Sequence, residues 1–410
     1  MNTHSGSFCI KSVKQGPVKV EIGPSIQDFS LGESIVKVFP LLELIFNYLT
    51  IDELKVCLQV CQEWKDIATE QISKRVGPSW FTCYKIISKK RKANVIEHSP
   101  NLNYNNVELG FIVYDKFRLN KFICLHNNVT ELSRKNMPEY LEEELVPKNV
   151  EYCLLSVHRI ASCFKTSRWF KDVQCNGSTF DGILFPKIPS MRTVMFHCNP
   201  STKKAVENMV NTYIRPFEHT KCLLLFTKTR LYNGLSNLLQ YIVPHERHQE
   251  VALAGGVIRG TKTFQKFNQS QRLFSAKDTI CIAFLKDSTN PMDNFNAYSC
   301  VITNTDTIHK KDFDKQLMEF KNGIRFRKHC IGLRVACSQS FLETELQSFE
   351  EILPDVPILG LEAQGEIGWN CYYDPVVEEN ERNQKKRLKK SNYPTAQWSF
   401  STVVVLITWD

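Results

Sequence analysis

The pattern of hydrophobic and polar positions indicates a helical segment near the start of the chain. Over residues 34–75 apolar residues recur at three- and four-residue spacing, which is typical of amphipathic helices. Pro40 is expected in a first helical turn, because farther inside a helix it would remove a hydrogen bond and clash with the preceding turn. Thr50 and Glu53 have the spacing of a capping box, which predicts the start of a second helix. Residues 1–30 have no sustained period and predict a flexible tail.

The second predicted helix carries two apolar stripes. One stripe contains Leu54, Cys57, Leu58 and Cys61, and the other contains Val56, Val60, Trp64 and Ile67. The first stripe can close a small helical module on itself, whereas the second needs a partner. A module of about 40 residues is usually too small to fold alone, and a large exposed apolar patch usually marks a protein interface. We therefore expect this module to bind another protein.

From residue 79 onward short apolar runs alternate with helical patterns. Several runs are apolar on successive residues, as expected for strands that are buried on both faces. The predicted strands are Thr193–Cys198, Cys222–Phe226, Val251–Gly256, Thr279–Leu285, Ile331–Cys337 and Ser401–Trp409. Helices are predicted at residues 203–214, 234–243, 314–323 and 340–353. The sequence thus predicts an α+β or α/β protein, with a short three-helix module at residues 31–78 and a large mixed α/β domain, in one or two lobes, at residues 79–410.

Composition narrows the class of protein. A hydrophobic fraction of 42% and a charged fraction of 23% are typical of soluble globular proteins. The first residues lack the layout of a signal peptide, and the apolar run Val403–Ile407 is much shorter than a membrane span. The 15 cysteines include no C-x-x-C spacing, so buried thiols in a reducing compartment are the simplest interpretation. We expect a protein of the cytoplasm, the nucleus or both, with no membrane partner.

The net charge of +9 is concentrated in two basic runs, at residues 89–92 and 385–390. The second run belongs to a predicted charged loop near residues 377–393. A solvated surface loop is the first interpretation, and a nuclear-import signal is the second. The residues of that signal would be Lys385, Lys386, Arg387, Lys389 and Lys390. No aromatic residues lie between the basic residues as stacking platforms for single strands, so we do not expect nucleic acid to be the main partner.

The helical module resembles an F-box. The pattern I-F-x-Y-L, then D-x-L, then V-C-x-x-W is filled by Ile45, Phe46, Tyr48, Leu49, Asp52, Leu54, Val60, Cys61 and Trp64. The leading proline of an F-box lies farther from its isoleucine than Pro40 does from Ile45. The resemblance implies that the module binds the Skp adaptor of an SCF ubiquitin ligase and, through it, cullin and RING subunits. The adaptor-binding residues implied are Pro40, Leu42, Ile45, Phe46, Leu49, Leu54, Val60, Cys61 and Trp64. For Leu49 and Trp64 internal packing is the main alternative.

Three glycine-containing segments lie in the large domain, at residues 180–186, 253–256 and 364–368. Each alone is explained by a tight turn after a strand, or by backbone that approaches a ligand closely. Taken in order, with "VAC" ending at Cys337 and a terminal strand, they resemble the C-terminal domain of FIST proteins. FIST domains are proposed to bind small ligands such as amino acids, and one eukaryotic F-box family contains them. The pocket implied for a ligand or a target is formed by Gly255, Gly256, Cys337, Gly365 and Glu366, but the Gly-Arg turn that usually follows the cysteine is missing.

No catalytic arrangement is evident in the sequence. The run His245–His248 lacks the H-E-x-x-H spacing of a zinc site, and His158, His197 and Cys198 would form a thiol–imidazole pair only if the fold brought them together. We predict no metal, no cofactor and no catalytic residue. The predicted function is that of a non-catalytic receptor subunit, which recruits target proteins for ubiquitination and proteasomal degradation. The alternative is an intracellular small-ligand sensor without a ligase role.

Overall fold

The computed structural model describes most of the chain after residue 38. The described residues are 39–87, 92–115, 124–125, 140–164, 175–199, 203–228, 234–243, 245–258, 264–267, 270–273, 279–290, 294–340, 342–372 and 395–410. The predicted tail at residues 1–30 and the predicted charged loop near residues 377–393 lie outside them. The chain divides into two compact units, Met1–Tyr48 (unit 1) and Leu49–Asp410 (unit 2).

The described part of unit 1 contains the helix α2 (Phe39–Asn47). Pro40 occupies the first turn of this helix, as the sequence predicted. A proline is tolerated there because the first N–H groups of a helix have no partner within the helix.

Unit 2 begins with the short helices α3 (Ile51–Cys57) and α4 (Gln62–Lys74). The predicted capping box is present, since the Thr50 amide donates to Glu53 Oε2 at 2.7 Å and the Glu53 amide donates to Thr50 Oγ1 at 3.4 Å. The chain turns between Leu58 and Cys61. The apolar stripe predicted on one helix from Val56 to Ile67 is therefore divided between two helices, and that detail of the prediction is wrong.

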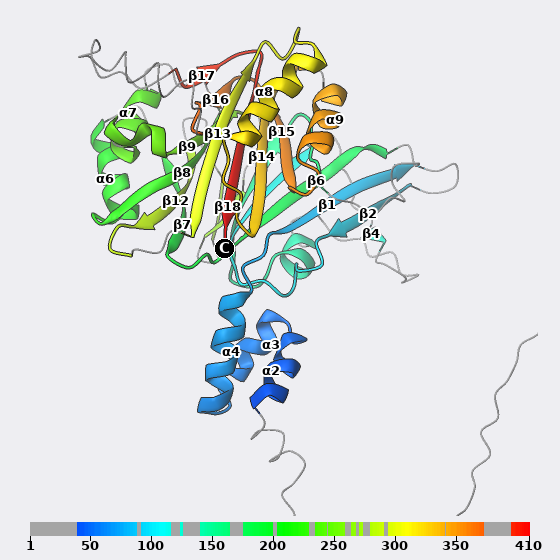
Figure 1. The fold of residues 1–410 in the computed structure, drawn as a ribbon, viewed down its shortest axis with the longest axis vertical. Helices are drawn as coiled ribbons and strands as arrows, with labels where there is room; N and C mark the ends of the chain where they lie inside the picture. Colours follow the sequence, from blue (N-terminus) through cyan, green and yellow to red (C-terminus); the bar gives the residue numbers. More distant parts are fainter. Residues whose placement is uncertain are drawn as a thin grey trace, which may run out of the picture. The chain divides into compact units, whose positions relative to one another are not determined.

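Within the described residues the strands of unit 2 form three sheets (Figure 1). The eight-stranded sheet has the order β11-β10-β5-β3-β6-β1-β2-β4, with β1 (Ser79–Ile87), β2 (Lys92–His98), β3 (Val107–Asp115), β4 (Cys124–Leu125), β5 (Glu151–Val157), β6 (Cys175–Pro186), β10 (Phe264–Phe267) and β11 (Ser270–Leu273). The six-stranded sheet has the order β17-β16-β9-β8-β12-β7, with β7 (Met191–Cys198), β8 (Glu218–Thr227), β9 (Ala252–Val257), β12 (Thr279–Asp287), β16 (Glu366–Gly368) and β17 (Gln397–Trp398). The four-stranded sheet has the order β13-β18-β14-β15, with β13 (Phe295–Thr303), β14 (His329–Cys337), β15 (Ile358–Ala363) and β18 (Ser401–Trp409).

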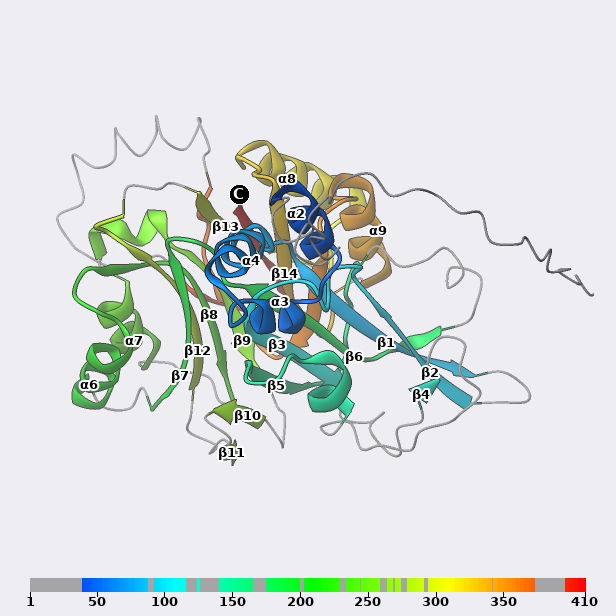
Figure 2. The same ribbon diagram turned by 90° about the horizontal axis from the view of Figure 1, so that it is seen from below.

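Helices cover the outer faces of two of these sheets (Figures 1 and 2). The six-stranded sheet packs against α6 (Lys203–Tyr213) and α7 (Gly234–Ile242), and the four-stranded sheet packs against α8 (Lys310–Asn322) and α9 (Leu342–Ile352). A short π-helix, η1 (Leu141–Leu145), packs on the eight-stranded sheet, and a 3-10 helix, η3 (His245–Glu250), precedes β9. All four predicted helices are present, and the mixed α/β architecture is confirmed.

The inner faces of the three sheets meet in one apolar core. Aromatic rings cross the boundaries between the sheets: Phe111 stacks on Phe226 with ring centroids 5.2 Å apart, and Phe185 meets Phe284 edge to face at 5.0 Å. The core contains residues of β3, β5 and β6, of β7, β8, β9 and β12, and of β14, β15 and β18. Each sheet therefore depends on the other two to bury its inner face.

Two of the glycine-containing segments have structural roles that differ from the predicted turns. Residues 180–186 lie inside β6, so the turn interpretation is wrong there; a Cβ on Gly182 would lie 2.2 Å from the Phe81 ring. Gly255 lies inside β9 with a φ of 157°, and a Cβ there would lie 1.7 Å from the Leu225 carbonyl oxygen. At both positions glycine allows strands and side chains to approach closely.

The close approach at Gly255 predicts a large loss of stability for Gly255→Ala. The new methyl group would collide with the backbone of β8, which cannot move without breaking its hydrogen bonds to β9 and β12. We expect the free energy of unfolding to fall by about 3 kcal/mol or more, as measured by urea unfolding followed by tryptophan fluorescence. Gly77→Ala is the control, because its Cβ would meet side-chain amides and no backbone, with Asn101 at 3.2 Å and Asn105 at 3.6 Å. Equal losses for the two variants would contradict this account.

Candidate functional site

The α2 residues predicted to bind an adaptor divide into exposed and buried members. Pro40 is exposed and Ile45 is 40% exposed, whereas Leu42 and Phe46 are each 1% exposed. Three further apolar side chains of this region, which the sequence reasoning did not select, are also exposed: Leu41 at 37%, Leu44 at 54% and Tyr48 at 76%. With Ile45 they occupy positions i, i+3, i+4 and i+7 and therefore form one stripe along the helix. We call Leu41, Leu44, Ile45 and Tyr48 the α2 stripe.

The residues of α3 and α4 divide in the same way. Leu54 is fully buried, together with Ile51, Cys57, Ile67 and Ala68, and forms the contact between the two helices and their surroundings in unit 2. Val60 is 57% exposed, and Val56, one turn earlier, is 64% exposed. Leu49, Cys61 and Trp64 are half-buried. Of the predicted residues in unit 2, Val60 is thus the one whose side chain is most available to a partner.

Hydrogen bonds attach α4 to the sheets of unit 2. The Arg75 guanidinium, at the end of α4, donates to the carbonyl oxygen of Leu49 and lies over the Tyr104 ring at 5.7 Å. Beyond it, the Trp409 indole N–H donates to the Val76 carbonyl oxygen at 2.5 Å, and the Asn105 amide donates to the Gly77 carbonyl oxygen at 2.7 Å. These partners come from distant parts of the sequence and hold residues 75–77 in one conformation. The α3–α4 pair is therefore a rigid extension of the α/β domain.

The structure brings the predicted pocket residues together. Gly256 pairs with Glu366 across β9 and β16, the Val257 amide donates to the Gly365 carbonyl oxygen at 2.8 Å, and Cys337 pairs with Ala363 where β14 and β15 end. Protein atoms fill the space beside the glycines, since a Cβ on Gly256 would lie 2.7 Å from the Ala363 Cβ. Glu366 is 1% exposed and accepts hydrogen bonds from the Ser401 amide and hydroxyl at 3.3 and 2.9 Å. It is a buried structural carboxylate.

Sequence reasoning missed a buried ion pair close to these strand ends. Arg334 on β14 is fully buried, and its Nε donates to Glu345 Oε2 on α9 at 2.8 Å. The other carboxylate oxygen of Glu345 accepts from the Thr402 hydroxyl at 3.0 Å. An arginine inside the apolar run "IGLRVAC" was the available signal, because a buried cation requires a buried partner. The pair fastens α9 to the middle of the four-stranded sheet.

A second buried acid lies between β1 and β6. Asp181 is fully buried and accepts from the Thr82 hydroxyl at 2.6 Å. Burial raises the pKa of Asp181 to about 6, although hydrogen bonds from Ser162, Thr82 and Ser178 act in the opposite direction. The carboxyl group therefore titrates well above the usual range of an aspartate.

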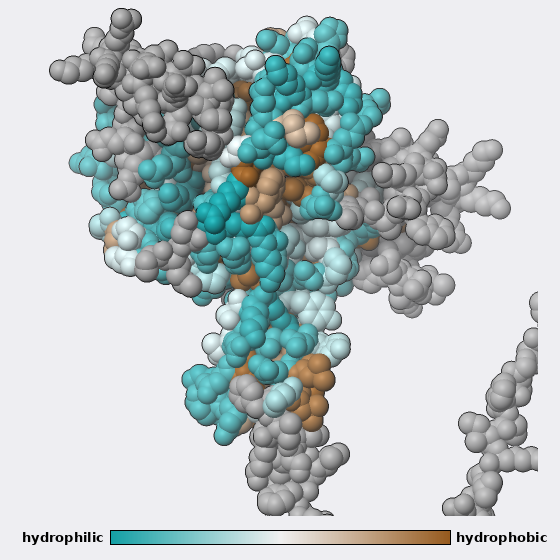
Figure 3. Space-filling view, viewed as in Figure 1, coloured by the Kyte–Doolittle hydropathy of each residue, from teal (hydrophilic) through white to brown (hydrophobic). Residues whose placement is uncertain are grey.

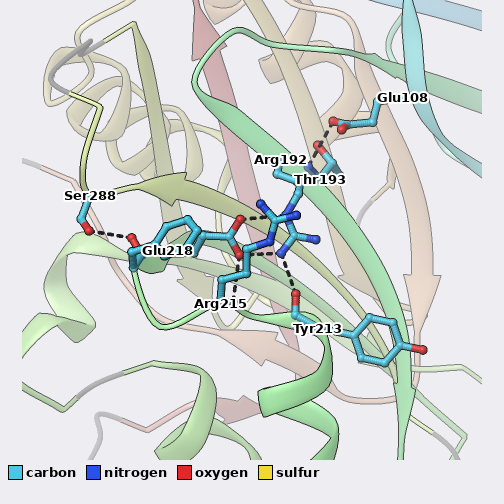
Figure 4. Close-up of polar contacts among 8 residues, drawn as sticks. Glu108, Arg192, Thr193, Tyr213, Arg215, Glu218 and Ser288 are labelled. Atoms are coloured by element: carbon cyan, nitrogen blue, oxygen red, sulfur yellow. Dashed lines mark hydrogen bonds and ion pairs between the residues drawn. The ribbon is translucent and has the colours of Figure 1, made fainter.

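A third polar cluster joins β7, β8 and the end of α6 (Figure 4). The Arg192 guanidinium donates to Glu218 Oε1 at 2.8 Å and to the Tyr213 carbonyl oxygen at 2.7 Å, and the Arg215 amide donates to Glu218 Oε2 at 2.9 Å. Burial alone would raise the pKa of Glu218, but hydrogen bonding to Arg192 and Arg215 lowers it overall. Burial raises the pKa of the neighbouring Glu108, which accepts from the Thr193 amide at 3.1 Å. The carboxylates here are occupied by structural contacts.

The other residues and segments considered in the sequence are placed as follows. His197 and Cys198 are consecutive on β7, so their side chains point to opposite faces of the sheet. In the part of the chain that the structure describes, no group of three or more metal-binding side chains is placed to hold a metal ion, and no helix is long and apolar enough to cross a membrane. The predicted import residues Lys385, Lys386, Arg387, Lys389 and Lys390 lie outside this part.

The buried Arg334–Glu345 pair predicts that the removal of one of its charges greatly lowers the stability of the protein. Glu345→Gln would leave Arg334 fully buried without a counter-charge, and we expect the free energy of unfolding to fall by about 3–5 kcal/mol. The double variant Arg334→Met, Glu345→Leu removes both charges and should recover most of this loss, because apolar residues replace a buried pair at little cost. Urea unfolding of the three proteins measures both effects. A double variant as unstable as the single variant would show that the ion pair is not the cause.

The raised pKa of Asp181 predicts a loss of stability as the pH rises. Because the folded protein holds this proton more tightly than the unfolded chain, stability falls between about pH 4 and pH 6, by up to about 3 kcal/mol. Asp181→Asn should remove this part of the pH dependence, as measured by urea unfolding across that range. Asp287→Asn is the control, since hydrogen bonds from Thr289 lower the pKa of the exposed Asp287. If the difference in the free energy of unfolding between wild type and Asp181→Asn does not vary with pH, the raised pKa of Asp181 is contradicted.

Comparison with known proteins adds little to this geometry. No protein-family model matches the chain, and no curated protein matches it. Among solved structures, cyanuric acid hydrolase from A. caulinodans is similar, with a TM-score of 0.26 and 8% sequence identity over 57% of this chain and 75% of that chain. A likeness at this level carries no argument about fold or activity. The function must therefore be inferred from the residues of this chain.

Proposed function

We propose that this protein is the substrate receptor of an SCF-type ubiquitin ligase, whose N-terminal helices bind a Skp-type adaptor. The α/β domain would hold a target protein for ubiquitination and proteasomal degradation. The observation that carries this proposal is the α2 stripe, in which four large apolar side chains are 37–76% exposed along one helix face. Exposed apolar side chains at i, i+3, i+4 and i+7 are the anchors by which a helix binds in a groove.

The exposed apolar side chains can contribute free energy to binding. Burying a large aliphatic or aromatic side chain contributes about 1.5–3 kcal/mol, and a part of that amount is available from each half-exposed member of the α2 stripe. Val56 and Val60 present two further exposed side chains. Of the residues that the F-box resemblance implies, Ile45 and Val60 are available to a partner, whereas Leu42, Phe46 and Leu54 are buried.

The attachment of α4 to the sheets supports a receptor function. Arg75, Val76 and Gly77 are held by Leu49, Trp409 and Asn105, so the α3–α4 pair cannot swing freely on the α/β domain. A target bound to that domain would then be held at a fixed position relative to the adaptor-binding residues of α3 and α4. Ubiquitin transfer to its lysines would become effectively intramolecular. The chemical step would belong to the conjugating enzyme and the RING subunit.

The alternative, a small-ligand sensor, has weaker support. Its pocket would need free space beside Gly255 and Gly256, but the Leu225 carbonyl oxygen and the Ala363 side chain occupy that space. Glu366, the polar group of that pocket, is engaged by Ser401. The sensor proposal would require saturable binding of a small molecule to unit 2.

The adaptor-binding proposal is tested by a pull-down of the full chain with purified Skp adaptor. We expect wild type to bind. Two double variants, one with Leu44→Asp and Ile45→Asp and the other with Val56→Asp and Val60→Asp, should each lose about tenfold or more in affinity, because a charge cannot be buried in an apolar groove. These positions are exposed, so the fold should tolerate the changes. A charge at the fully buried Leu54 would instead unfold the helices.

The matched control is Met318→Asp, which places the same charge at an exposed apolar position of α8. It should bind the adaptor like wild type. Circular dichroism should give the same spectrum for every variant. If wild type does not bind, or if Met318→Asp loses as much affinity as the helix variants, the receptor proposal fails.

A further inference from the structure

A short basic segment follows α8. Between α8 and β14 the chain runs through residues 323–328, which include Arg325, Arg327 and Lys328, and Lys321 in the last turn of α8 adds a fourth cation. Phe326, in the middle of this segment, is 40% exposed. Figure 3 shows hydrophobic atoms surrounded by hydrophilic ones on this face of unit 2, below α8 and over β13 and β14. An exposed aromatic side chain among cations is a common feature of protein interfaces.

Side chains of the four-stranded sheet fix the backbone of this segment. The Arg325 amide donates to the Tyr298 hydroxyl at 3.3 Å, the Arg327 amide to the Thr408 hydroxyl at 2.7 Å, and the Lys328 amide to Asp410 Oδ1 at 3.3 Å. The segment has no regular secondary structure, yet it has three tertiary hydrogen bonds in four residues. Its conformation is therefore set before any partner arrives, which lowers the entropic cost of binding.

The cations of this segment are unequally neutralised. Arg327 pairs with Asp410 at 2.8 Å and its side chain is 7% exposed, and the Lys321 ammonium donates to the Ile352 carbonyl oxygen at 2.7 Å. Arg325 and Lys328 are exposed, and neither forms an ion pair with the residues that the structure describes. Two exposed cations therefore flank the exposed Phe326, and the Arg325 charge also helps to lower the pKa of the nearby Asp410.

We propose that Arg325, Phe326 and Lys328, which we call the basic–aromatic surface, bind an acidic peptide segment of the target protein that carries a large apolar side chain. The two cations attract the carboxylates, and Phe326 receives the apolar side chain. The inference rests on the proposed receptor function and identifies where in unit 2 the target is held.

The position of this surface suits a receptor. Trp409 packs beside His329 with ring centroids 5.8 Å apart and donates to Val76 at the end of α4. The basic–aromatic surface therefore lies at the end of unit 2 from which α4 extends, as the position of the C-terminus in Figure 1 also shows. A peptide bound there would be held close to the adaptor-binding helices of unit 2.

The test uses the full chain and a short fluorescein-labelled peptide in which glutamates surround a central phenylalanine. Fluorescence anisotropy should show saturable binding that weakens with salt. The variant Arg325→Glu, Lys328→Glu should lose about tenfold or more in affinity, and Phe326→Ser should lose about threefold. The control Lys311→Glu, Lys315→Glu makes the same change of charge at two exposed lysines of α8 and should bind like wild type.

Three outcomes would overturn the proposal: no binding of the peptide, an equal loss in the α8 control, or tighter binding of a single-stranded RNA of similar length that competes for the surface. A peptide whose phenylalanine is replaced by serine should bind wild type more weakly than the original peptide does. The Phe326→Ser variant should bind the two peptides with equal affinity. The adaptor pull-down of Arg325→Glu, Lys328→Glu separates this inference from the receptor proposal. If peptide binding depends on Arg325 and Lys328 but wild type does not bind the adaptor, the receptor proposal fails and the basic–aromatic surface remains.

Discussion

The structure of unit 2 depends on the burial of three sheet faces against one another. None of the sheets could bury its inner face alone, because the aromatic contacts Phe111–Phe226 and Phe185–Phe284 join residues of different sheets. Such contacts require backbones to approach closely, and glycine makes this possible where β9 passes the four-stranded sheet, since a Cβ on Gly256 would lie 2.7 Å from the Ala363 Cβ of β15. The constraint explains why a glycine-rich strand lies in the middle of the molecule and why its glycines need no ligand to account for them.

This constraint also determines where function can be located. The shared core occupies the inner faces of the sheets, and helices cover the outer faces of the six- and four-stranded sheets. The buried polar groups within this arrangement, Asp181, Arg334 and Glu366, are each engaged by neighbouring side chains. Binding surfaces are therefore to be sought on the outside, at helices and connecting segments with exposed apolar side chains. The α2 stripe and the basic–aromatic surface are of this kind.

The sequence predicts strands well where all their buried residues are apolar, and poorly where some buried residues are polar. The strands β7, β8, β9, β12, β14 and β18 were predictable, because each is apolar on successive residues. The strands β1, β3 and β6 were not, since they include Thr82, Asp115 and Asp181, which are polar but buried. Gly182 added to the difficulty: its lack of a side chain suggested a turn, whereas it accommodates the Phe81 ring inside a strand. Periodicity alone cannot distinguish a buried polar residue from one in a loop.

The adaptor-binding residues show a related limit of sequence reasoning. In a helix as short as α2, Leu42 and Phe46 occupy one face and Leu41, Leu44, Ile45 and Tyr48 another, and both faces are apolar. Hydrophobicity cannot tell which face is buried within the protein, so the residues selected from the motif include both the exposed Ile45 and the buried Leu42 and Phe46. The exposed face is also the informative one. Among the described residues few large apolar side chains are exposed, and where several of them gather on one face, as in the α2 stripe, a partner accounts for their exposure. The same reasoning applies to Phe326, which is held in an exposed position by a backbone that Tyr298, Thr408 and Asp410 fix.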